Sequence, residues 1–193
     1  DVTLTGGLRG LLSGFDIDIS LGYGRNHIAF GVENTINPSY GPTTPTAFDA
    51  GALTYDQLVF GVDAHRQIEA GLFGPLSLAL GLEARRETYQ IGAGEAASCE
   101  RGAFTTVSGT AVSWGSRGFS GFTPAKEVDE GRGNIGVYVD LEAEVVENLT
   151  LAGALRLESY SDFGENLTGK IAARYDVSPS FAVRGSVSTG FRA

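Results

Sequence analysis

The sequence predicts an all-β fold made of long antiparallel strands, and three observations predict it. Apolar and polar residues alternate along most of the chain, which is the period of a strand with two unlike faces. Eight segments show this alternation, most over about 10 to 14 residues, whereas ordinary strands average about five or six. Short and long connections alternate between the segments. A strand that crosses a bilayer needs about nine to eleven residues, so the lengths favour a transmembrane β-barrel.

The first three segments show the alternation less regularly than the rest. Their apolar positions are Val2, Leu4 and Leu8, then Phe15, Ile17, Ile19, Leu21 and Tyr23, and then Leu58, Phe60, Val62 and Ala64. The fourth segment runs from Pro75 to Glu87, with leucine or alanine at its even positions. Each segment can therefore present one apolar face.

The last four segments repeat the pattern. Their apolar positions include Ile135, Val137, Val139, Leu141, Ala143 and Val145, then Leu149, Leu151, Leu155 and Leu157, then Leu167, Ile171, Ala173, Tyr175 and Val177, and finally Phe181, Val183 and Val187. The opposite positions carry mixed charge, and in a barrel they would face the lumen. The candidate lumen-facing residues are Glu83, Arg85, Glu87, Asp140, Glu142, Glu144, Arg156, Glu158, Lys170, Arg174 and Arg184.

The connections predict which ends of the strands face outwards. Short ones are expected near residues 10–14, 70–74, 147–148 and 178–179, long ones over 27–53 and 92–131, and a smaller one over 161–166. Bacterial outer-membrane barrels have short periplasmic turns and longer extracellular loops. We therefore expect a meander whose long loops lie outside the cell.

Charge and motifs exclude several classes of function. The net charge of −9 argues against a nucleic-acid partner, because phosphate binding needs a basic face. Cys99 stands alone and the histidines His27 and His65 lie on different segments, so no spacing predicts a metal site. Asp63 shares a face with His65, but no nucleophile can be assigned to them. We expect no cofactor, no catalytic residue and no enzyme.

One motif resembles a phosphate-binding loop without completing it. Residues 164–170 match the pattern for seven positions, but Ile171 stands where the magnesium-binding hydroxyl should be. A period-two strand follows instead of a helix. We interpret this segment as a tight turn leading into a strand.

The C-terminal third carries the residues that identify a family. In order it reads GVYVDLE (136–142), LRLESYSDFG (155–164), TGKIAARY (168–175) and VRGSVSTGFRA (183–193). This series resembles the barrel of TonB-dependent outer-membrane receptors, and the glycine-phenylalanine-arginine-alanine ending is its most specific part. Residues 22–26 and 73–89 are also similar to that family.

The resemblance implies a 22-stranded barrel with a plug in its lumen, of which residues 1–193 would be an open, curved part. The sequence begins at Asp1 without an initiator methionine or signal peptide, and the plug and the final aromatic strand have no counterpart. We expect a partial barrel in the outer membrane of a Gram-negative bacterium.

The resemblance also implies active transport without covalent chemistry. A small-molecule nutrient, such as a siderophore–iron complex, cobalamin or a saccharide, would bind outside, and the TonB complex would supply energy through the missing plug and TonB box. The partners would be outer-membrane lipid, the nutrient and TonB. The second long loop carries the candidate ligand-contacting residues Phe104, Trp114, Phe119 and Phe122, which could equally pack the loops together.

Two other architectures remain open at this point. A complete small eight-stranded outer-membrane barrel, with a structural, adhesive or enzymatic role, would close its first strand against its last. A soluble β-sandwich binding module would bury the leucine faces between two sheets. An open sheet would exclude both.

Overall fold

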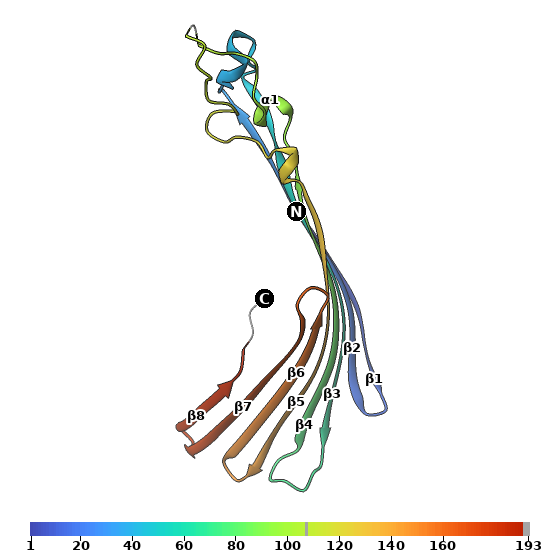
Figure 1. Ribbon diagram of the computed structural model, residues 1–193. Coiled ribbons are helices and arrows are strands. Elements are labelled where there is room, and N and C mark those ends of the chain that lie inside the picture. The colour runs from blue at the N-terminus through green and yellow to red at the C-terminus, as the bar shows by residue number, and fades with distance from the viewer. Residues whose placement is uncertain (107, 191–193) are drawn as a thin grey trace. The chain divides into compact units, whose positions relative to one another are not determined.

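The computed structural model describes residues 1–106 and 108–190 and shows one antiparallel sheet of eight strands. Each strand pairs with the next one along the chain (Figure 1). The strands are β1 (Val2–Leu12), β2 (Phe15–Glu33), β3 (Ala47–Ile68), β4 (Leu76–Gly92), β5 (Val128–Val146), β6 (Leu149–Tyr160), β7 (Gly164–Ser178) and β8 (Phe181–Ser188). The helices are short: η1 (Pro38–Thr43), α1 (Ala96–Cys99) and η2 (Pro124–Lys126). The predicted all-β meander is confirmed.

The register matches like side chains across neighbouring strands. Val139 of β5 lies opposite Leu155 of β6, and the next pair is Tyr138 with Arg156. Because side chains alternate between the two faces of a sheet, apolar residues gather on one face and polar residues on the other. We call these the apolar face and the polar face.

The tight turns use residues that tolerate a positive φ. Ser13 and Gly14 connect β1 to β2 with φ values of 51° and 81°, which is the pattern of the two-residue hairpin turn that suits twisted strands. Asn148 connects β5 to β6 with φ of 66°. Asparagine adopts this region more readily than most residues.

Four strands are longer than their alternation predicts, so the predicted loop boundaries were wrong. The first loop spans only residues 34–46 and the second only 93–127, because β2, β3, β4 and β5 continue as paired strands. Backbone pairing continues there although the apolar–polar alternation fades. The smaller connection shortens to 161–163, and Gly164 opens β7 with φ of 91°. The incomplete phosphate-loop motif is therefore the predicted turn and strand.

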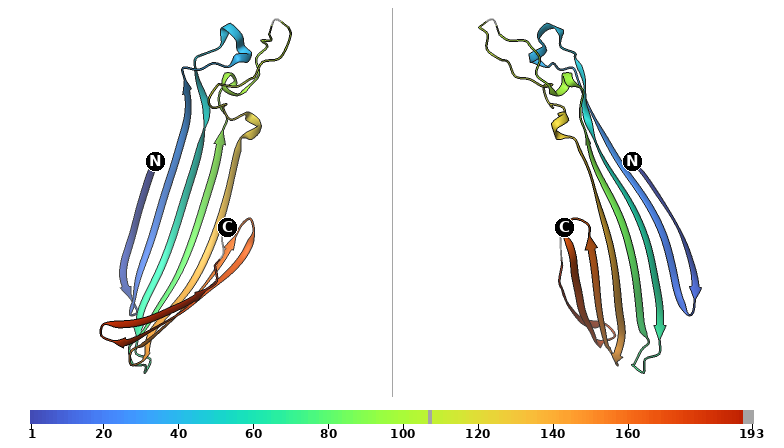
Figure 2. Two further views of the ribbon diagram at one scale, coloured as in Figure 1. Left: turned by 90° about the vertical axis from the view of Figure 1, so that its left-hand side faces the viewer. Right: turned by 45° about the vertical axis from the view of Figure 1, so that its right-hand side comes forward.

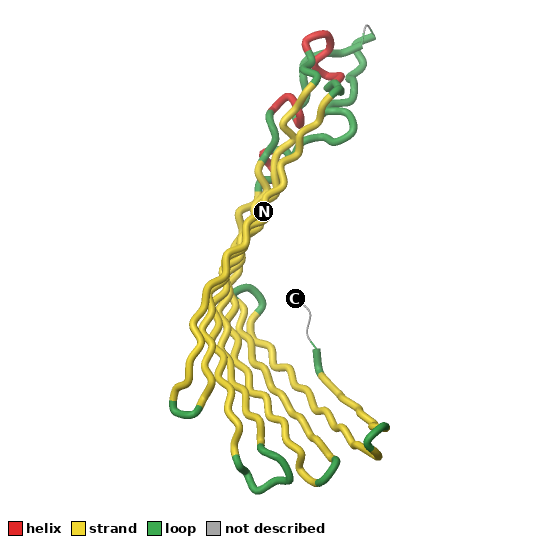
Figure 3. Tube along the Cα trace, turned by 180° about the vertical axis from the view of Figure 1, so that it is seen from behind, coloured by secondary structure: helices red, strands yellow, loops and turns green. Residues whose placement is uncertain are grey.

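The chain divides into two compact units, each described separately. The loop unit comprises Asp1–Thr3, Gly24–Gln57 and Glu87–Gly131, and thus contains both long loops. The wall unit comprises Leu4–Tyr23, Leu58–Arg86 and the described residues from Arg132 onwards. All eight strands contribute to the wall unit, where they lie side by side in a curved sheet (Figures 2 and 3).

Buried side chains gather in the loop unit. Phe48, Ala50 and Cys99 are among its buried apolar residues. In the wall unit large apolar side chains are exposed instead; Leu155 is 54% exposed and Ile171 is 72% exposed. An apolar face of this kind needs an apolar environment such as lipid.

The sheet is open across the described residues, because β1 and β8 stand at opposite ends of its strand order. A closed eight-stranded barrel would pair these two strands, and a sandwich would need a second sheet. Neither alternative architecture is present in residues 1–106 and 108–190.

No helix in the described part of the chain is both long enough and apolar enough to cross a membrane.

Candidate functional site

The two long loops are joined through the side chain of Asn37 in the first loop. Asn37 is fully buried, and its amide nitrogen donates to the carbonyl oxygens of Ala97 and Glu100 at 2.8 and 3.0 Å. Its amide oxygen accepts from the backbone N–H and the hydroxyl of Ser39 at 3.1 and 2.7 Å. One side chain of the first loop therefore binds polar groups of both loops.

Ser39 extends this connection towards the tip of the second loop. Its hydroxyl oxygen accepts from the N–H of Gly102 at 2.8 Å, and its carbonyl oxygen accepts from the N–H of Phe104 at 2.9 Å. A Cβ at Gly102 would lie 2.2 Å from the Ser39 carbonyl oxygen, so a glycine is required for this approach. We call Asn37, Ser39, Gly102 and their bonded neighbours the loop junction.

Two of the four predicted ligand-contacting aromatics pack inside the loop unit. The rings of Phe119 and Phe122 lie 5.3 and 5.7 Å from the ring of Phe30 on β2, and 5.6 Å from each other. Such edge and tilted contacts stabilise aromatic clusters beyond simple burial. Phe119 is still 38% exposed, so packing occupies only part of its surface.

The other two aromatics are more exposed. The ring of Phe104 lies against Gly41, where a Cβ would come within 2.5 Å of it, yet Phe104 is 45% exposed. Trp114 is 47% exposed. The structure thus separates the four residues into a packed pair and a pair presented outwards.

Cys99 is buried at the end of α1. Its thiol lies 3.5 Å from the carbonyl oxygen of Glu95, and burial raises the pKa of the Cys99 thiol. Because the thiolate is the reactive form, this cysteine is poorly suited to be a nucleophile or a metal ligand.

The predicted lumen-facing residues share the polar face, and several form ion pairs, of which the pair of Glu83 with Arg156 joins two strands. Glu83 binds Arg85 at 2.8 Å on its own strand and Arg156 at 3.6 Å from β6. Arg156 also binds Glu158 at 2.9 Å. A chain of four alternating charges therefore runs over β4 and β6.

Cations gather on β7 and β8 of the polar face. Lys170, Arg174 and Arg184 line a hollow of about 820 Å³ together with Glu142 and Asp176. Arg174 stands directly opposite Arg184 and binds Asp176 at 2.8 Å.

Three further predicted positions have partners or neighbours on the same face. Glu87 accepts hydrogen bonds from Tyr55 and from Gln57, the latter at 3.3 Å. Glu144 accepts from the N–H of Asn148 at 2.7 Å and so braces the turn between β5 and β6. Asp140 pairs in register with Ala154 of β6.

Asp63 and His65 have separate partners. The carboxylate of Asp63 accepts from the phenol of Tyr138 at 2.6 Å, and His65 shares a hydrogen bond of 2.9 Å with Ser77. Among the described residues no group of three or more histidines, cysteines and acids could hold a metal ion.

Tyr138 was missed as a site residue by sequence reasoning. Its ring lies over Gly81 of β4, where a Cβ would come within 1.9 Å of it. A glycine in the middle of a strand often marks such a close approach, and Gly81 was the available signal.

The sequence that forms this open sheet was compared with known proteins and protein families. A search of curated proteins found no match. Residues 2–193 match the family described as "TonB dependent receptor-like, beta-barrel". Because this match covers nearly the whole chain, the chain belongs to the TonB-dependent receptors, which are energised transporters and not enzymes, of the Gram-negative outer membrane.

Proposed function

We propose that the chain supplies wall strands and two outer loops to a receptor that imports a scarce small-molecule nutrient. The nutrient binds first at the loop unit and then passes along the polar face. The TonB complex acts through the plug and its TonB box. The observation that carries the proposal is the division of the wall unit into an apolar face and a face lined with paired charges.

The polar face lines the lumen in this proposal, and the apolar face contacts lipid. Leu155 and Ile171 are mostly exposed on the apolar face, and an outward apolar band is the mark of an outer-membrane barrel. The charges on the polar face need water or partners, which a lumen with a plug provides.

The loop unit is suited to hold a ligand because its loops are fixed to each other. The loop junction orders the first and second loops before any ligand binds, which lowers the conformational cost of binding. Trp114 and Phe104 present aromatic surface at their exposed sides. We propose these two residues as the first contacts for the nutrient, which is a siderophore–iron complex, cobalamin, a saccharide or a similar molecule.

An uptake assay with the full-length receptor tests the transport role. Cells with and without TonB are given ferric siderophores, cobalamin and maltooligosaccharides in turn, and uptake of each is measured. We expect one of them to be taken up only when both receptor and TonB are present. Uptake independent of TonB, or no uptake of any small nutrient, would contradict the proposal.

Matched loop variants test the contact residues. Trp114→Ala and Phe104→Ala are expected to weaken nutrient binding, whereas Phe163→Ala, which changes an aromatic in the turn between β6 and β7, is expected to leave it unchanged. Equal binding by all three variants would show that Trp114 and Phe104 do not contact the nutrient.

Spin labels test the assignment of the faces. A Cys99→Ser background with a single new cysteine at Leu82 or Glu83 carries the label on opposite faces of β4. We expect dissolved oxygen to relax the label at Leu82 and a water-soluble nickel complex to relax the label at Glu83. The reverse result would mean that the polar face contacts lipid and the apolar face lines the lumen.

A further inference from the structure

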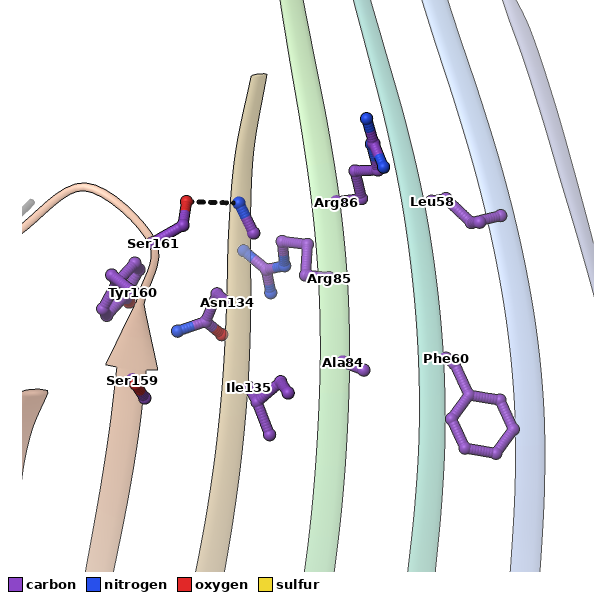
Figure 4. A pocket seen from close by; sticks show the side chains of 11 residues that line it. Leu58, Phe60, Ala84, Arg85, Arg86, Asn134, Ile135, Ser159, Tyr160 and Ser161 are labelled. Atoms are coloured by element: carbon purple, nitrogen blue, oxygen red, sulfur yellow. Dashed lines mark hydrogen bonds between the residues drawn. The ribbon is translucent and has the colours of Figure 1, made fainter. Parts of the chain in front are cut away.

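The apolar face of the wall unit contains a groove of about 500 Å³ that crosses β3, β4, β5 and β6. Figure 4 shows Phe60, Ala84 and Ile135 in a row across three of these strands. Ala84 is small and Gly133 has no side chain, so the surface of the apolar face is recessed at these two positions, between larger residues. The N–H of Gly133 donates to the hydroxyl of Ser161 at 2.9 Å at one end of the groove (Figure 4).

The groove is complete within the described sheet. Each of the four strands has a neighbour on both sides in the strand order. No further strand is therefore needed to form its walls.

Arg86 lies at the edge of this groove and belongs to the apolar face. It continues the even-numbered series Leu82 and Ala84 along β4, whereas Glu83 and Arg85 form the ion pair on the polar face. Arg86 is exposed, and no hydrogen bond or ion pair joins it to any other described residue. Arg86 lines the groove, and its charge is unpaired among the described residues.

Charge is rare on the apolar face. In the described wall unit the strand alternation places three charged residues there, namely Arg66, Arg86 and Glu165. The guanidinium of Arg66 lies 5.4 Å above the ring of Phe15, and Glu165 stands on β7 opposite Ser159. Arg85 also lines the groove but is paired with Glu83, so Arg86 is the unpaired cation that adjoins the groove.

The position of Arg86 along β4 places it at the edge of a bilayer. It is the eleventh residue of a strand that starts at Leu76 and leads to the second long loop. About nine to eleven residues cross the hydrocarbon layer, so Arg86 reaches the headgroup level on the outer side. Arginine binds phosphate through two parallel hydrogen bonds and is preferred where such oxygens must be held.

We infer that this groove binds a lipid of the outer leaflet whose phosphate-bearing headgroup carries a net negative charge, with an acyl chain along Phe60, Ala84 and Ile135 and the phosphate on Arg86. The inference rests on the proposed contact of the apolar face with lipid. The apolar groove matches the chain, and the unpaired cation at its edge matches the headgroup.

Native mass spectrometry of the full-length receptor tests the inference. The receptor is released from mixed micelles that hold equal amounts of phosphatidylglycerol and phosphatidylcholine, and the retained lipids are counted. We expect retention of phosphatidylglycerol to exceed that of phosphatidylcholine by about fivefold, since one arginine near an anionic surface contributes about that factor. Arg86→Gln should abolish the preference.

A groove-filling variant and two matched controls distinguish binding in the groove from the effect of any arginine on the apolar face and of any enlarged side chain on β4. Ala84→Phe fills the groove and should reduce retention of both lipids. Arg66→Gln removes the other arginine of the apolar face, and Leu82→Phe enlarges a neighbouring residue on the same strand; both should retain lipid as the unchanged receptor does.

Four results would overturn the inference, and the first three concern lipid preference and oligomeric state. One is equal retention of the two lipids by the unchanged receptor, another is an unaltered preference in Arg86→Gln, and the third is a receptor dimer that covers the groove. Displacement of the bound lipid by inorganic phosphate alone would also overturn it, because the acyl chain would then contribute nothing. The spin labels at Leu82 and Glu83 test the face assignment separately, so a correct assignment with no lipid preference would reject only this inference.

Discussion

The phenol of Tyr138 donates to the carboxylate of Asp63 at 2.6 Å, and its ring covers Gly81 on the strand between them. The contact therefore ties β5 to β3 across β4. It lies within the wall unit and uses the absence of a side chain at Gly81 as the space for an aromatic ring.

Gly81→Ala is expected to destabilise the barrel by about 1–3 kcal/mol, because the new methyl group would overlap the Tyr138 ring and force it away. Thermal unfolding of the full-length receptor in detergent measures the effect. Gly153→Ala is the matched control, since the nearest atom to a Cβ at Gly153 is 4.0 Å away. Equal losses in the two variants would mean that the Tyr138 ring does not depend on the space at Gly81.

Tyr138→Phe is expected to cost about 0.5–1.5 kcal/mol, because it removes one hydrogen bond and keeps the ring. If Asp63 is the partner that matters, Asp63→Asn combined with Tyr138→Phe should cost less than the sum of the two single changes. Strict additivity in this double-mutant cycle would show that the two side chains are not coupled.

Asn37→Ala is expected to separate the two long loops. The change leaves the carbonyl oxygens of Ala97 and Glu100 without their donor in a part-buried place, and such an unsatisfied group costs at most about 1–3 kcal/mol. Hydrogen exchange at the amides of Gly102 and Phe104 should become faster, because these amides donate to Ser39. Thr43→Ala changes an exposed residue of the same loop and should leave both amides protected.

Cys99 is expected to react slowly with thiol reagents at neutral pH. The raised pKa keeps the thiol protonated at neutral pH. The reaction rate should therefore rise as the pH increases, and it should still be rising beyond pH 9, which is the ordinary pKa of a cysteine thiol. Reaction with a chromogenic disulfide between pH 7 and 10 measures this profile. Asn37→Ala should speed the reaction by exposing α1, whereas fast labelling of the unchanged receptor at pH 7 would show that the thiol is not shielded.

Arg156→Gln is expected to change stability by less than about 1 kcal/mol, although Arg156 contacts two carboxylates. The side chains of Arg156, Glu83 and Glu158 are 34%, 27% and 15% exposed, so solvent still screens these ion pairs and limits their contribution. Chemical denaturation of the full-length receptor measures this value. A loss of several kcal/mol would indicate that the polar face is shielded from water, for example by a tightly packed plug.

The sequence allowed prediction of the features that depend on neighbouring residues. Alternation identified all eight strands, and the turn at Ser13 and Gly14 follows from residues that accept a positive φ. The assignment of Glu83 and Arg156 to one face also followed, because side chains in a strand alternate with a period of two.

The loop junction and the glycine contact could not be predicted in this way. Asn37 and Glu100 are 63 positions apart, and nothing local to either residue indicates that they meet. Tyr138 and Asp63 are 75 positions apart. The end of β2 and the start of β3 could not be predicted either. Backbone pairing continues there without the apolar–polar alternation from which the strand boundaries are predicted.

The strand order has a consequence for how such walls change in evolution. Every strand pairs with its neighbours in sequence. The two strands of each hairpin therefore hydrogen-bond to each other and do not depend on distant segments for these bonds. Contacts of short sequence separation form early and cheaply. Excision of β6 and β7 together would bring β8 beside β5 with its direction and its two faces unchanged. The wall can therefore gain or lose strands in pairs, and barrel circumference becomes a quantity that hairpin duplication can adjust.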